Sequence, residues 1–387
     1  MNEIRTAPER LFWLDGIKGI SCLCVFLHHF CLRYFPATFY GLEAASMANG
    51  VDLFLASSPL GLLINGNFFV HLYIQISGYV ISYQVIKLRS EDFGYFMLKR
   101  YLKLLIPLFV FFAFWFLLKV IENIGNPDLL KFSMKELYKG IYSLFLGILF
   151  KGDIYLGSHF WMMNYIFLGG VIVGILSSLC WKYDSKKVMF LSLFCGVLVF
   201  ILFISQLSLH YATIFFGCAL CLFNKNYDLK LNKYVSNLLF IIGLIFAAFP
   251  TYLVPENFYR FFLLPFDKHN AFSKYFWHSF SAVLIIFSVS KSEWLKKFFS
   301  NGLFQEFSKI SFWVFIFHGI IISIIDKLLF AKLESALNYL TLVLILFVVD
   351  LVLVILVTVL LYLFISPLCN KITKYLLSKV CVSKESN

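Results

Sequence analysis

The sequence predicts an all-α, polytopic membrane protein with about ten membrane-spanning helices and both termini in the cytoplasm. Three observations predict this class: a high apolar content, apolar runs of membrane-spanning length, and the placement of Lys and Arg between those runs. Of 387 residues, 61% are hydrophobic and 14% are charged, and the mean hydropathy is +0.85. Soluble domains carry about 25% charged residues, so the composition excludes an ordinary water-soluble domain.

The apolar runs define the candidate spans, because a spanning helix needs about 20 mainly apolar residues. The candidates cover residues 11–33, 64–86, 102–122, 160–181, 187–205, 208–224, 236–254, 276–291, 307–326 and 339–366. Several are short or contain polar residues, which indicates tilt or burial inside a helix bundle. A further apolar segment, Ile141–Phe150, is too short to span and is expected to be re-entrant or interfacial. The surrounding stretch, 123–159, is expected to form an outer loop.

Basic residues occupy alternate connections between the candidate spans. They lie before the first span, after every second span, and in the short tail 367–387, whereas the connection 34–63 contains only Glu43 and Asp52 as charged residues. Cytoplasmic loops of membrane proteins collect Lys and Arg, so this pattern assigns the basic connections and both termini to the cytoplasm. We expect residues 1–387 to form one membrane-embedded domain without internal repeats, ending in a basic cytoplasmic tail.

The net charge of +12 follows from these cytoplasmic connections, so the sequence does not indicate nucleic-acid binding. Cys218 and Cys221 form a C-x-x-C pattern, but they lie inside an apolar run and no second pair accompanies them. Cysteine in such a run behaves as a small hydrophobic residue, so neither a metal site nor a redox site is expected.

Ionisable residues in the first candidate span are candidate functional residues, because each costs at least ~2.5 kcal/mol at bilayer depth on insertion scales. This span contains Asp15, Lys18, His28 and His29. Lys18 and His29 are three helical turns apart, on nearly the same face and about 16 Å apart along the axis. They either line an internal groove, or Lys18 extends to the headgroups while His29 bonds a neighbouring helix.

A second basic cluster, Lys99-Arg100-Tyr101-Leu102-Lys103, precedes and opens the third candidate span. Arg100 and Lys103 are i,i+3 neighbours on one helix face. Near a helix N-terminus they are suited to hold phosphates, but from the sequence alone a topology signal is the favoured explanation.

Other polar residues in the candidate spans allow more than one interpretation. His318 is either functional or a helix-packing histidine, His278 is expected near the outer interface, and Asp350 has no evident partner. Ser77-Gly78 most simply permits close helix contact.

Four motifs, in order along the chain, resemble those of the acyltransferase 3 family of membrane acyltransferases, and the resemblance covers essentially the whole chain. Leu14–Ile20 followed by Phe26–Phe30 is similar to the opening "LDGLRGIA…FHF" signature. The later motifs are Phe69–Ile81, Phe96–Arg100 with Lys103 and Pro107, and Ile310–His318.

The resemblance implies an O-acyltransferase of the plasma (inner) membrane. Its donor is acyl-CoA, with acetyl-CoA as the default co-substrate, and its acceptor is a hydroxyl of a cell-surface or exported saccharide, free or lipid-linked. No bound cofactor or metal is implied. On this basis His29 is the general base or an acyl-carrying nucleophile, and Lys18, Arg100 and Lys103 bind the donor phosphates. Supporting roles are assigned to Asp15, His28, Ser77, Trp161 and His318.

The sequence departs from the family pattern at several positions. The family often has a Trp followed five residues later by Glu; Trp161 is retained here, but Ile166 occupies the Glu position. Lys18 and Lys103 stand where arginine is common, which keeps the charge and loses the bidentate guanidinium fork.

Two other functions fit the composition. A transporter or flippase of a lipid-linked sugar or solute would use intramembrane Lys and His as substrate sites, but the sequence lacks the repeats typical of that class. A polysaccharide polymerase would place acidic or arginine residues in a large outer loop, and the 123–159 stretch shows no such pattern.

Overall fold

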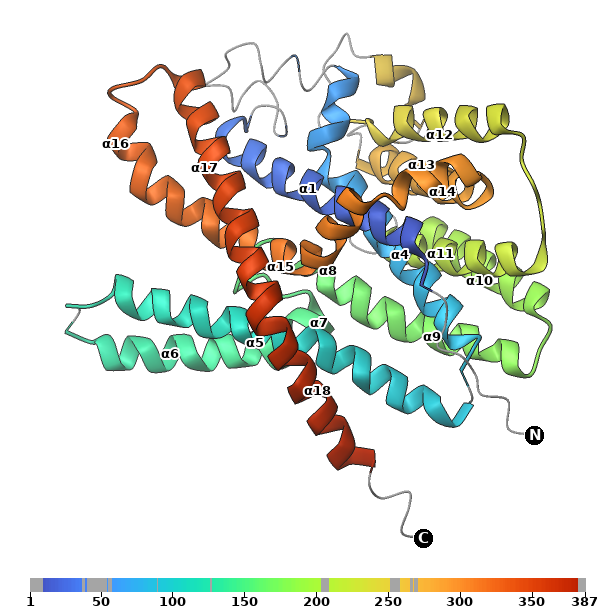
Figure 1. Ribbon diagram of the computed structural model, residues 1–387, viewed down its shortest axis with the longest axis horizontal. Helices are drawn as coiled ribbons and strands as arrows, with labels where there is room; N and C mark the ends of the chain where they lie inside the picture. The colour runs from blue at the N-terminus through green and yellow to red at the C-terminus, as the bar shows by residue number, and fades with distance from the viewer. Residues whose placement is uncertain are drawn as a thin grey trace. The chain divides into compact units, whose positions relative to one another are not determined.

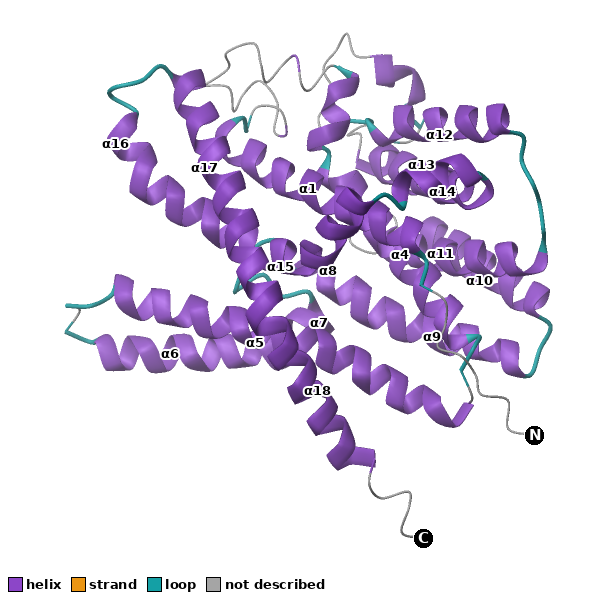
Figure 2. Ribbon diagram, viewed as in Figure 1, coloured by secondary structure: helices purple, strands orange, loops and turns teal. Residues whose placement is uncertain are grey.

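The computed structural model describes residues 10–36, 39, 54, 58–88, 90–125, 127–202, 209–250, 258–264, 267 and 271–381. All regular structure in these residues is helical (Figure 2), which confirms the all-α prediction. The chain forms two compact units, each contributed by two segments. Unit 1 comprises Met1–Leu88 and Ile172–Ser311, and unit 2 comprises Arg89–Val171 and Phe312–Asn387.

Unit 1 contains most of the N-terminal and central helices (Figure 1). They are α1 (Phe12–Tyr34), η2 (Pro59–Ile64), α4 (Gly66–Val85), η6 (Leu179–Trp181), α10 (Ser185–Leu202), α11 (Leu209–Asn226), α12 (Lys233–Ala247), η7 (Phe258–Phe262), α13 (Ala271–Lys291) and α14 (Glu293–Phe299). Two further helices, α9 (Gly170–Ser178) and α15 (Gly302–Ile325), contribute residues to both units.

Unit 2 contains several helices that are continued through π-helical turns. Its elements are η3 (Ser90–Asp92), α5 (Phe93–Glu122), α6 (Leu129–Tyr142), η4 (Ser143–Gly147), α7 (Ile148–Lys151), α8 (Trp161–Asn164), η5 (Tyr165–Gly169), η8 (Asp326–Phe330), α16 (Ala331–Leu333), α17 (Tyr339–Leu360), η9 (Leu361–Ile365) and α18 (Ser366–Cys381). The predicted basic tail is therefore helical as far as Cys381.

Each candidate span overlaps a helix in the described part of the chain, and the structure supports a multi-pass membrane protein. Among the described residues, seven helices are long and apolar enough to span: Phe12–Tyr34, Phe93–Glu122, Trp161–Trp181, Ser185–Leu202, Phe272–Lys291, Gly302–Leu333 and Tyr339–Val380. Of the other candidates, α12 has 15 residues, and α4 and α11 contain buried polar side chains such as His71 and His210. The count of ten spans and their orientation remain predictions.

The stretch 123–159 is not an irregular loop, because Leu129–Lys151 is helical; its position on the outer side remains a prediction. This segment turns back alongside α5 (Figure 1), and a Cβ at Gly140 would lie 2.1 Å from the Phe112 ring. The helix is amphipathic, with lysines interleaved among apolar residues such as Leu130 and Tyr138. A search for long apolar runs therefore misses it. The interfacial or re-entrant position of Ile141–Phe150 remains a prediction.

Small residues bring α4 and α11 into backbone contact in unit 1. A Cβ at Gly78 would lie 2.2 Å from the carbonyl oxygen of Ile214, and one at Gly217 would lie 2.0 Å from the carbonyl oxygen of Gln75. These approaches confirm the close helix contact predicted at Ser77-Gly78, where Ser77 itself is half-buried. Such contacts are typical of helix packing in membranes, where small residues let backbones approach.

The close contact between α4 and α11 predicts that one added methyl group destabilises the protein. Gly217→Ala should lower the thermal unfolding temperature of the detergent-solubilised protein, since over-packing costs about 1–3 kcal/mol and the obstructing atom belongs to the backbone. Gly302→Ala is the control, because a Cβ there meets nothing within 4 Å. An unfolding temperature for Gly217→Ala equal to that of the control would contradict the close contact.

Candidate functional site

The predicted residues at the start of α1 form an ion-paired cluster in unit 1. Asp15 Oδ2 lies 2.7 Å from Arg10 Nε, and Asp15 Oδ1 lies 3.6 Å from Lys18 Nζ. The Lys18 carbonyl also accepts a hydrogen bond of 3.0 Å from the Tyr73 hydroxyl. Among the described residues of this cluster, one carboxylate faces two cations, and the Lys18 side chain is 26% exposed. It is therefore positioned by Asp15 and still accessible to an anion.

His28 and His29 lie together near the other end of α1, with ring centroids 5.1 Å apart. His28 Nδ1 lies 2.9 Å from the Ile64 carbonyl oxygen, so this nitrogen carries a proton and donates it. A Cβ at Gly66 would lie 2.3 Å from the His28 ring. His28 thus holds the start of α4 through Ile64, and both imidazoles are half-buried.

Arg100 contacts the position at which the sequence departs from the family pattern. Its Nη2 donates a hydrogen bond of 3.2 Å to the Ile166 carbonyl oxygen. Ile166 belongs to the π-helical turn η5, and such turns interrupt the regular bonding of helix carbonyls, often at functional sites. Ile166 stands at the position of the family glutamate, and within unit 2 its main-chain oxygen contacts the Arg100 guanidinium.

The expected helix N-terminus at Arg100 and Lys103 is wrong, because α5 begins at Phe93. The positive end of a helix dipole acts over about one turn, so it does not reach these side chains. Lys103 is exposed and Arg100 is half-buried, and any phosphate binding here depends on the side chains themselves.

His318 and Trp161 both lie in unit 2 beside aromatic neighbours. Trp161 begins α8 and contacts the Tyr165 ring edge-on at 5.8 Å. His318 is 1% exposed, and its Nδ1 lies 2.9 Å from the Val314 carbonyl. Its ring centroid is 4.7 Å from that of His159, a residue that the sequence analysis missed. The sequence feature that could have identified His159 was its position two residues before Trp161.

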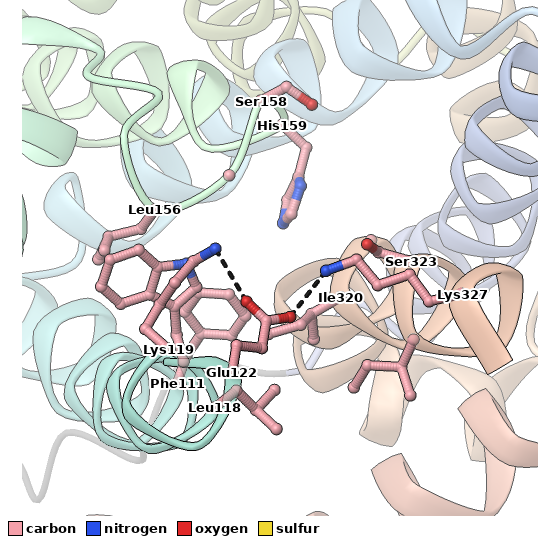
Figure 3. A pocket seen from close by; sticks show the side chains of 14 residues that line it. Phe111, Leu118, Lys119, Glu122, Leu156, Ser158, His159, Ile320, Ser323 and Lys327 are labelled. Atoms are coloured by element: carbon pink, nitrogen blue, oxygen red, sulfur yellow. Dashed lines mark hydrogen bonds and ion pairs between the residues drawn. The ribbon is translucent and has the colours of Figure 1, made fainter. Parts of the chain in front are cut away.

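His159 lines a pocket of about 230 Å³ in unit 2. In Figure 3 its imidazole points from the loop before α8 toward Glu122, which is flanked by Lys119 and Lys327. Glu122 Oε1 lies 2.7 Å from Lys327 Nζ, and Oε2 lies 3.3 Å from Lys119 Nζ; we call these three residues the ion triad. The pocket is lined by Phe111, Trp115, Leu118, Lys119, Glu122, Leu156, Gly157, Ser158, His159, Gly319, Ile320, Ser323, Ile324 and Lys327.

The hydrogen bonding of His159 fixes its tautomer. Nε2 lies 3.3 Å from the Ile316 carbonyl oxygen, so Nε2 carries the proton and Nδ1 keeps its lone pair. A Cβ at Gly319 would lie 3.2 Å from Nδ1, so glycine there leaves room beside this nitrogen. His159 precedes the span that begins at Trp161, and burial, with a smaller effect of His318, holds its pKa well below the ordinary histidine value. The imidazole is therefore neutral at physiological pH.

Unit 1 contains a second group of buried histidines outside the predicted site. The His71 ring stacks on that of His210 at 4.5 Å and lies 5.8 Å from that of His278. Thr213 Oγ1 lies 3.0 Å from His71 Nδ1. His278 contacts the Asn65 side chain at 3.0 Å and lies fully buried about two turns into α13; its predicted depth near the outer interface is not tested. In the described part of the chain, no three His, Cys, Asp or Glu side chains are arranged to hold a metal ion.

Comparison with known proteins identifies the class of the chain. The family model described as an acyltransferase domain, that of acyltransferase 3, matches residues 11–376. An O-acetyltransferase of Phomopsis amygdali, PaAT-1, is 37% identical over 79 residues, which are 20% of this chain and 15% of that protein. The matched part thus spans less than a sixth of that relative. No solved structure matches the chain. Because the family model covers nearly its whole length, the chain belongs to the acyltransferase 3 family of membrane acyltransferases.

Proposed function

We propose that the protein is an O-acyltransferase that moves an acetyl group from acetyl-CoA to a hydroxyl of a cell-surface or exported saccharide. The observation that carries this proposal is the arrangement on α1, where a lysine positioned by Asp15 and the half-buried His29 lie on one helix of a family member. A cation and a titratable imidazole are the groups that an anionic donor and a hydroxyl acceptor require. The relative from Phomopsis amygdali, named as an O-acetyltransferase, supports acetyl as the group transferred.

In the proposed reaction His29 takes the proton of the acceptor hydroxyl as its oxygen attacks the thioester carbonyl. The C–S bond breaks, the ester C–O bond forms, and the CoA thiolate leaves and recovers the proton from the imidazolium. The same residue supports a two-step route, in which the imidazole first carries the acyl group. Arg100 and Lys103 in unit 2 are proposed to bind donor phosphates in both routes, and Lys18 in unit 1 is a separate proposed phosphate contact, because charge-assisted hydrogen bonds suit phosphate oxygens.

The membrane proposed for this reaction is the plasma (inner) membrane, with the donor on the cytoplasmic side. This assignment is supported by the basic residues at the cytoplasmic end predicted for α5. Membership of an acyltransferase family argues against the transporter and polymerase alternatives, and no contact among the described residues favours them.

Removal of the imidazole tests the role of His29. His29→Gln should reduce the rate of acetyl transfer by about 10²–10⁴-fold, the usual contribution of a general acid–base group, and leave the donor KM unchanged. The measurement is transfer of acetyl label in membranes with matched amounts of protein. Leu27→Ala, which truncates a half-buried apolar side chain on the same helix, controls for packing. Full activity of His29→Gln would contradict the proposal.

Removal of the guanidinium tests donor binding. Arg100→Ala should raise the KM for acetyl-CoA by about 10–100-fold, since a hydrogen bond to a charged group contributes about 1.5–3 kcal/mol. Arg100→Lys should raise the KM less than Arg100→Ala does, because lysine keeps the positive charge but lacks the bidentate guanidinium. Lys131→Ala removes an exposed lysine of α6 in the same unit and should leave the KM unchanged. Equal donor KM values for Arg100→Ala and the native chain would remove Arg100 from the donor site.

A further inference from the structure

The ion triad in the unit 2 pocket has more hydrogen-bond donors than acceptors. Both carboxylate oxygens of Glu122 are engaged, one by Lys119 and one by Lys327. Each ammonium group has three N–H donors and uses one of them for Glu122, so donor capacity remains on both lysines. The triad also carries one net positive charge. It is therefore suited to a ligand that brings negatively charged oxygen atoms.

The remaining walls of the pocket suit a small ring with several hydroxyls. Phe111 and Trp115 provide an apolar aromatic wall, and Ser158 and Ser323 are among the lining residues. Such a combination of apolar surface and a few polar groups is typical of small-molecule sites. The volume of about 230 Å³ lies below the range of about 300–1,000 Å³ for drug-sized ligands. A pocket of this size accommodates a single sugar residue.

The ion triad is not a chance pairing within one exposed helix. Lys327 and Glu122 are 205 positions apart in the sequence, and the fold of unit 2 brings them together at the edge of the pocket (Figure 3). Isolated surface ion pairs contribute little to stability, about 0–1 kcal/mol. Stability alone therefore gives little reason for placing three charges beside a cavity.

The position of the pocket along α5 matches the predicted side of the acceptor. Arg100 and Lys119 are nineteen residues apart on this helix, which corresponds to about 28 Å along its axis. The hydrocarbon core of a bilayer is about 30 Å thick. Since the Arg100 end is predicted to be cytoplasmic, the pocket belongs at the outer end.

We propose that this pocket binds the acceptor, and that the acceptor is an anionic saccharide carrying a carboxylate or a phosphate ester. Lys119 and Lys327 bind its anionic group, the aromatic wall packs against its ring, and the imidazole of His159 lines the same pocket. This inference rests on the proposed acyltransferase function and adds the charge of the substrate.

Direct binding to the purified full-length protein tests the inference, with thermal unfolding in detergent as the readout. The probes are glucuronic acid, glucose 6-phosphate, glucose and inorganic phosphate. At least one anionic sugar should bind about tenfold or more tightly than glucose, as expected for a charge-assisted contact. Tighter binding of glucuronic acid would indicate an acceptor with a carboxylate, and tighter binding of glucose 6-phosphate would indicate an acceptor with a phosphate ester. Equal affinity for glucose and both anionic sugars, or binding of inorganic phosphate as tight as that of glucose 6-phosphate, would overturn the proposal.

Substitutions in the ion triad separate binding from misfolding. Lys327→Gln should reduce the preference for the anionic sugar about tenfold, whereas Glu122→Gln should strengthen anion binding because it removes the competing carboxylate. A gain of affinity cannot result from a damaged fold. Lys131→Gln on α6 is the control and should change neither the affinity for the anionic sugar nor the affinity for glucose. Weaker anion binding by Glu122→Gln would overturn the proposal.

The two proposals fail in distinguishable ways, because sugar binding needs neither acetyl-CoA nor His29. Anionic sugar binding in a protein that transfers no acetyl group would support the pocket and contradict the acyltransferase mechanism. Acetyl transfer that remains unchanged in Lys119→Gln and Lys327→Gln, with no sugar binding, would support the mechanism and remove the pocket from it.

Discussion

The structure depends on the constraint that hydrocarbon offers no hydrogen-bond partner to a polypeptide. Each backbone N–H and C=O in a membrane must be satisfied within the protein, and helices do this within one segment. The same constraint determines which side chains are buried and which are exposed. Polar groups face one another inside unit 1, as in the contacts of Ser177 with Ser82 and of His71 with Thr213, while α10 exposes apolar residues such as Phe194 and Ile201.

Polar side chains suited to chemistry can exist in such a fold only where the packing around them provides partners. Asp15 positions Lys18, the Ile64 carbonyl holds His28, and a main-chain oxygen of the η5 turn contacts Arg100. In unit 2, Gly319 leaves room for the imidazole of His159. Lys18, His28 and Arg100 therefore each have a partner that fixes the direction of the side chain, which is the pre-organisation that catalysis requires.

The sequence was sufficient to predict the helical class, the location of the candidate spans and the polar residues of α1, because these depend on composition and on spacing within one helix. It did not reveal the helix at Leu129–Lys151, whose amphipathic pattern lacks a long apolar run. The pocket was missed for another reason. His159 and Ile316 are 157 positions apart, and a contact across that distance leaves no local pattern. The Arg100 contact was invisible because its acceptor is a main-chain carbonyl rather than a side chain.

The most direct test of the central claim is transfer of label from radioactive acetyl-CoA in inverted membrane vesicles that contain the native chain, compared with vesicles that lack it. Inverted vesicles present the cytoplasmic face to the added donor. The account predicts label in the saccharide fraction only when the chain is present, in proportion to its amount. The same low label in both preparations, with abundant native saccharide available as acceptor, would contradict it.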